Sequence, residues 1–204
     1  MKYEIPDEFK QFVANVRRRC TVNGIELMLS PSKNVVITDT FSTDCSGYFD
    51  EVNKVLVVAC GKPFKEWIEI LVHEYSHMQQ WLTDDRWGHW TDCCLDLWDW
   101  LDGEKELDEV QIRKVIDGMI DLERDCEIRA MENIRRWGLP INKTRYARKA
   151  NLYLYSYRVL PLIRKFPTGL YENAELIKMC PTKILKRHDI VPEGIKSLII
   201  KTYG

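Results

Sequence analysis

Two histidines separated by three residues, His73 and His77, constrain this chain more than any other feature of its sequence. In a helix, side chains four residues apart lie one turn apart on the same face, so both imidazoles can reach one metal ion. Glu74 directly follows the first histidine, where its carboxylate can accept a proton from a water molecule at that metal. The pattern H-E-x-x-H therefore predicts a helix over residues 65–82 with a zinc site (Zn2+) on one face.

The residues around the motif support this helix. Gly61 and Pro63 end a β-type run, and apolar side chains then recur every three or four positions. These apolar positions are Trp67, Ile68, Leu71, Tyr75, Met78 and Leu82. The helix is therefore expected to bury one face in a core.

The rest of the chain divides into a short β region and long helices. The β-type runs cover residues 24–29, 34–37, 48–49 and 54–60, with a hairpin connection at 50–53. The other helical patterns cover residues 6–20, 91–101, 107–137 and 144–158, with Pro161 kinking or ending the last. We predict an α+β fold with a small mixed β-sheet upstream of the metal-site helix and a mainly helical part after it.

This length fits one domain over residues 1–204. Its expected parts are a β-containing region to about 62, a helical metal-binding region over about 63–165 and a mixed basic tail over 166–204.

The composition indicates a cytoplasmic protein. The N-terminal residues contain no apolar signal segment, and no run approaches the length of a membrane span. The seven cysteines are scattered or adjacent and form no CxxC pair, which favours free thiols over disulfides or a cysteine zinc site. We therefore expect no membrane partner.

The net charge of −1 hides a strong asymmetry. Residues 66–137 carry 8 basic and 19 acidic side chains, whereas residues 138–204 carry 13 basic and 4 acidic ones. Either the basic last third folds back against the acidic middle, or each end attracts a different partner. We favour the first interpretation.

A catalytic zinc site needs a third protein ligand and one open position. A metzincin is excluded, because Gln80 and Thr83 stand where its pattern requires glycine and histidine. The helix over 107–137 offers Glu123 and Glu127 in its apolar stripe, where buried carboxylates are costly unless paired or bound to metal. By composition alone, further candidates for the third ligand are His89, Asp92, Asp96 and Asp99.

The runs HEYSH and ERDCEIRA resemble the gluzincin metallopeptidases, which pair HExxH with a downstream acidic motif. This resemblance implies that Glu123 is the third zinc ligand and that Glu127 supports a ligand histidine, with Cys126 at a small-residue position. Glu127 replaces the usual aspartate, and the 45 residues between the motifs make residues 83–104 an insertion. The wider runs are also similar to small metallopeptidase-like proteins of tailed phages, which would place the chain in the host cytoplasm.

The resemblance implies a zincin-like fold and a peptide or protein substrate. In that fold, a strand upstream of the motif helix pairs with the substrate, and residues 54–60 stand at this place. An internal strand without a ligand role is the alternative interpretation. The sequence does not identify the residue that stabilises the oxyanion.

Two other functions compete with a zinc metallopeptidase. The chain could keep a zincin fold as a catalytically weak binding protein that acts on a partner protein, although Glu74 would then be unnecessary. It could also bind nucleic acid through its basic last third, which includes Lys143, Arg145, Lys183 and Arg187. We disfavour nucleic acid because the acidic middle offers those charges an internal partner.

Overall fold

The computed structural model describes residues 4–37 and 43–204, which form a mixed α+β fold that is mostly helical. The prediction of an α+β class is confirmed. Contacts group the chain into two compact units, the first made of residues 1–84 with 129–141 and the second of 85–128 with 142–204. The boundary falls inside one continuous helix, α4 (Glu109–Arg136), so that residues of this helix belong to both units. One domain over residues 1–204 stays a prediction.

The first unit contains a three-stranded sheet in the order β1-β5-β4. The strands are β1 (Glu26–Ser30), β4 (Gly47–Asp50) and β5 (Val55–Ala59). Strand β5 pairs in parallel with β1 and antiparallel with β4, with Gly47 opposite Val58. Strands β2 (Val35–Ile37) and β3 (Thr43–Cys45) form a separate antiparallel pair.

Strand β5 is therefore an internal strand, and the expectation that residues 54–60 form a substrate-pairing edge is wrong. Both of its backbone edges are used, because β1 and β4 flank it. Strand β4 lies at one edge of the sheet. The predicted turn joins it to β5 in a hairpin. In this turn, the carboxylate of Asp50 accepts hydrogen bonds from the backbone N–H groups of Val52 (2.9 Å) and Asn53 (2.8 Å).

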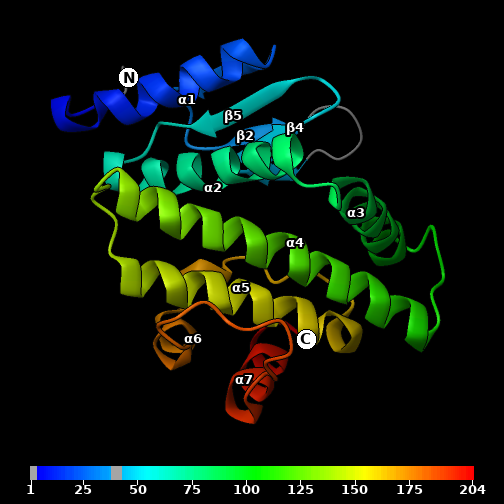
Figure 1. The fold of residues 1–204 in the computed structure, drawn as a ribbon. Helices are drawn as coiled ribbons and strands as arrows, with labels where there is room; N and C mark the ends of the chain where they lie inside the picture. Colours follow the sequence, from blue (N-terminus) through cyan, green and yellow to red (C-terminus); the bar gives the residue numbers. More distant parts are fainter. Residues whose placement is uncertain (1–3, 38–42) are drawn as a thin grey trace. The chain divides into compact units, whose positions relative to one another are not determined.

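Two helices complete the core of the first unit (Figure 1). Helix α1 (Lys10–Val22) follows a short 3₁₀ turn and buries Phe12, whose ring meets Tyr75 edge to face. Helix α2 (Phe64–Thr83) begins after Pro63 and packs on β4 and β5. As predicted, α2 buries the apolar face that contains Trp67, Ile68 and Leu71.

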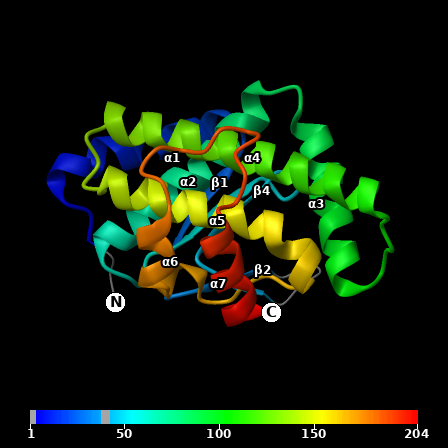
Figure 2. The same ribbon diagram turned by 90° about the horizontal axis from the view of Figure 1, so that it is seen from below.

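The second unit is helical and contains its own core. Its helices are α3 (Trp87–Asp102), the first five turns of α4, α5 (Lys143–Ile163), α6 (Ala174–Met179) and α7 (Glu193–Tyr203). Figure 2 shows α6 and α7 beside α5, which they both contact. Helix α3 begins four residues before the predicted Thr91, and α5 continues through Pro161.

Ion pairs join the basic last third of the chain to its acidic middle. Arg158 pairs with Asp117 at 2.5 Å, and Arg187 pairs with Asp121 at 2.5 Å. Arg164 also pairs with Glu106 at 3.0 Å. These contacts lie within the second unit and confirm that the basic segment folds back onto acidic residues.

All seven cysteines are free thiols, as the sequence indicated. Burial raises the pKa of Cys20 to about 11 and that of Cys180 to about 12, so both thiols stay protonated near neutral pH. Within the described residues, no helix is both long enough and apolar enough to cross a membrane.

Candidate metal centre

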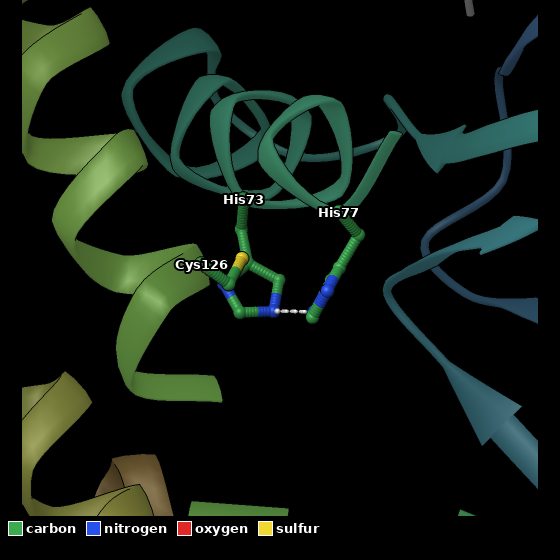
Figure 3. A group of neighbouring side chains, drawn as sticks. All are labelled: His73, His77 and Cys126. Carbon is green, nitrogen blue, oxygen red and sulfur yellow. Dashed lines mark hydrogen bonds between the residues drawn. The ribbon is translucent and has the colours of Figure 1, made fainter. Parts of the chain in front are cut away.

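The two motif histidines lie on the same face of α2 with their rings nearly perpendicular. Their Nε2 atoms are 3.2 Å apart and their ring centroids are 4.7 Å apart. Figure 3 shows both side chains leaving the same side of the helix. Helical periodicity produces this arrangement, because residues 73 and 77 are four positions apart in an uninterrupted helix.

The distance between the two Nε2 atoms fits a shared metal ion. A tetrahedral zinc ion holds nitrogen ligands at about 2.0–2.1 Å, which sets two such nitrogens about 3.3 Å apart. The observed 3.2 Å matches this geometry. The separation of the two nitrogens is therefore compatible with one ion bound through both rings.

Gln80 fixes the orientation of one imidazole. Its Oε1 lies 2.9 Å from Nδ1 of His77, and the Gln80 side chain is fully buried. An amide oxygen only accepts hydrogen bonds, so Nδ1 donates its hydrogen and Nε2 keeps its lone pair for a metal. Such support of a ligand histidine is typical of metal sites.

Glu74 is buried beside strand β4. Only 8% of its surface is exposed, although it carries a carboxylate. An ideal Cβ built on Gly47 of β4 would lie 3.3 Å from Cγ of Glu74. The carboxylate side chain is thus confined between the motif helix and an edge strand, which is a suitable position for a proton-transfer group.

Helix α4 packs along α2 through its last turns. The side-chain amide of Asn133 donates to Oε1 of Gln79 at 2.8 Å and to Oγ of Ser76 at 3.4 Å. Arg129 donates to Oγ1 of Thr83 at 3.1 Å and pairs with Asp84. These contacts hold the last turns of α4 against α2.

Cys126 places a sulfur atom close to the two imidazoles. Its Sγ and one ring nitrogen from each of His73 and His77 all lie within 4.8 Å of one another. Figure 3 shows the three side chains close together. In the part of the chain that the structure describes, no other group of three histidine, cysteine or carboxylate side chains meets this distance.

Glu123 and Glu127 are buried, as their place in the apolar stripe predicted. Glu123 is 6% exposed and Glu127 is 4% exposed. Neither belongs to the group formed by His73, His77 and Cys126. The role of Glu123 as a zinc ligand and that of Glu127 as support of a ligand histidine stay predictions. Glu123 also lies near Tyr157: burial raises the pKa of this tyrosine well above its ordinary value, and the charges of Tyr153 and Glu123 raise it further.

His89, the alternative ligand considered from the sequence, lies on α3. Its Nε2 is 3.8 Å from Sγ of Cys93, and the histidine is exposed. It does not belong to the group formed by the motif histidines.

Four contributors to the site were not identified from the sequence as functional. Cys126 had been placed only at a small-residue position, although its spacing of three from Glu123 puts both on one helix face. Gln80 carries a similar signal, since it follows His77 by three residues. Gly47 and Asn133 carry no such signal, because their contacts join segments far apart in the chain.

Comparisons with protein-family models, with curated proteins and with solved structures give no match to this chain.

Proposed function

We propose that this chain is a zinc-dependent metallopeptidase of zincin-like fold. The observation that carries the proposal is the 3.2 Å separation of the two Nε2 atoms on one face of α2, next to a buried glutamate. When bound, zinc supplies a Lewis acid and a water molecule acidic enough to ionise near pH 7. The residues of the chain orient the ion and move the protons.

Each motif residue has a distinct role in the proposed reaction. His73 and His77 hold the metal, and Gln80 keeps His77 in the tautomer that presents Nε2. Glu74 accepts a proton from the attacking water and delivers it to the leaving amine. Its burial limits the access of bulk solvent to the carboxylate, which strengthens its interactions with the reacting groups.

Helix α4 supplies the third ligand, and the geometry favours Cys126. Its sulfur lies within reach of both imidazoles, and thiolate is a common zinc ligand. The resemblance to gluzincins points to Glu123 instead, one turn earlier on the same face. The two assignments can be distinguished after zinc is replaced by cobalt, because only a thiolate ligand produces a sulfur-to-cobalt charge-transfer band.

Strand β4 is the edge that fits an extended peptide substrate. Strand β5 has no free edge, whereas β4 pairs with β5 on one side and approaches Glu74 through Gly47. A peptide added beside β4 would gain main-chain hydrogen bonds near the proposed general base.

The first test compares metal content and activity in the same preparations. Wild type should bind about one zinc ion per chain, and His73→Ala should lose it. Glu74→Gln should keep the zinc and the fold but cleave casein at least ~100-fold more slowly, because general base catalysis contributes about 10²–10⁴-fold. Full activity in Glu74→Gln, or wild-type protein that binds no zinc, would overturn the proposal.

The second test identifies the third ligand. Cys126→Ser and Glu123→Gln are each loaded with cobalt, and their near-ultraviolet spectra are compared with that of wild type. We expect the charge-transfer band in wild type and in Glu123→Gln, and its loss in Cys126→Ser. A wild-type protein without the band, together with loss of metal in Glu123→Gln, would assign the ligand to Glu123.

A further inference from the structure

A pocket of about 360 Å³ lies within the second unit. Helix α3 contributes His89, α4 contributes its early turns, and the segment after α6 contributes Arg187. The volume lies in the range of about 300–1,000 Å³ that is typical of small-molecule pockets. None of the proposed zinc ligands lines this pocket.

Two of the lining cations have no carboxylate partner. Arg113 and Lys114 are exposed neighbours on α4, and across residues 4–37 and 43–204 neither forms an ion pair. The other lining cation, Arg187, is held by Asp121 at 2.5 Å. The pocket therefore contains positive charge that the protein itself does not neutralise.

The carboxylate in the wall is already neutralised. Asp117 lines the pocket, and its Oδ1 accepts a hydrogen bond of 2.5 Å from Arg158. Arg158 also donates to the backbone carbonyl of Arg187 at 3.1 Å, which ties the Arg187 segment to α5. Among the lining side chains, three cations thus face one carboxylate, which leaves a net charge of +2 before His89 is counted.

Gly118 brings the two helices of the pocket together. A Cβ at this position would lie 2.4 Å from Sγ of Cys93 and 3.7 Å from Nε2 of His89. Because glycine permits this approach, the imidazole of His89 lies at the pocket beside the cations of α4. Hydrogen-bond donors from α3, α4 and the segment after α6 therefore line the same pocket.

We propose that this pocket binds a small phosphorylated molecule through its phosphate groups. Guanidinium and ammonium groups from several directions suit the oxygens of a phosphate better than the two oxygens of a single carboxylate. A diphosphate also supplies enough negative charge to neutralise the net +2. The site is separate in its residues from the proposed zinc site and does not depend on peptidase activity.

The test measures binding of inorganic pyrophosphate and ADP to the full chain by calorimetry at low ionic strength. We expect both ligands to bind wild type. The double substitution Arg113→Gln with Lys114→Gln should raise Kd at least ~10-fold, because it removes two charged hydrogen-bond donors to the phosphate. The matched control is Lys143→Gln with Lys178→Gln, which removes the same charge from exposed positions of the same unit and should leave Kd unchanged.

Three outcomes would overturn the proposal. Equal weakening in both double variants would show attraction by overall charge instead of a pocket. Binding that disappears after zinc is removed with EDTA would place the phosphate at the metal. A single-stranded oligonucleotide that binds when pyrophosphate and ADP do not would assign the cations to nucleic acid. Each outcome leaves the zinc content and casein assays unaffected, so the two proposals fail independently.

Discussion

Gly47 lets strand β4 approach α2 more closely than a side chain would permit. A Cβ at this position would lie 2.7 Å from Cγ2 of Ile70 and 2.8 Å from the backbone oxygen of Val57. The Val57 oxygen belongs to the central strand β5 and cannot move without disturbing the sheet. The same added atom would lie 3.3 Å from Cγ of Glu74, so the position of the proposed general base also depends on this glycine.

We therefore predict that Gly47→Ala destabilises the protein and impairs catalysis. The free energy of unfolding in urea should fall by about 1–3 kcal/mol, the usual cost of overpacking a core. Activity on casein should fall as well, because β4 or Glu74 must shift. The control is Gly88→Ala on α3, where an added Cβ meets nothing within 4 Å. Equal stability of wild type and Gly47→Ala would contradict the close approach.

The motif residues could be predicted because their signal is local. His73, Glu74 and His77 depend only on the period of one helix, and the burial of Glu123 and Glu127 follows from the period of another. The choice between Glu123 and Cys126 could not be made in this way. Both lie on the same face of α4, and the sequence does not show which donor atom reaches the imidazoles.

At the scale of elements, Asn133 links α4 to the motif helix. Its side chain is 6% exposed and donates to Gln79 and Ser76 of α2. Both acceptors lie within one turn of His77. The bonds therefore fix the distance between α4 and the helix that carries the two imidazoles.

Asn133→Ala should lower the free energy of unfolding by about 1–3 kcal/mol, because it removes a buried donor and leaves the side-chain oxygen of Gln79 without its hydrogen bond. Zinc affinity should also fall, since the proposed third ligand lies on α4. Chemical denaturation and zinc titration measure the two effects. Glu132→Ala, an exposed position on the same helix, serves as the control and should change neither. An Asn133→Ala protein as stable as that control would contradict the role of this contact.

The helices were more predictable than the strand order. The periods of α2 and α4 were visible in the sequence, whereas the position of β5 inside the sheet depends on parallel pairing with β1. That pairing joins residues 26 and 55, and no local pattern indicates it. Helix α3 begins early, at Trp87, because Trp90 is buried in the core of the second unit and packing outweighs the helix cost of Gly88.

At the scale of the whole molecule, ion pairs join the two oppositely charged segments of the chain. Arg158, Arg164 and Arg187 of the last third pair with carboxylates of the middle third. Arg113 and Lys114 come from the acidic middle, where most of the charged side chains are carboxylates. Their unpaired charges at a pocket are therefore a local departure from the overall pattern, and net charge alone would not have revealed them.

Metal binding should stabilise the whole chain, because the proposed ligands come from segments about 50 residues apart and are brought together only by folding. A ligand that binds only the folded state adds about 2.7 kcal/mol when its concentration exceeds Kd a hundredfold. For a chain of this size, that increment should raise Tm by roughly 5–10 °C. Differential scanning calorimetry with zinc and with EDTA measures the shift. His73→Ala should show none, whereas Glu74→Gln should keep all of it, since Glu74 is not a ligand. A wild-type Tm that is the same with zinc and with EDTA would show that the two imidazoles do not hold an ion.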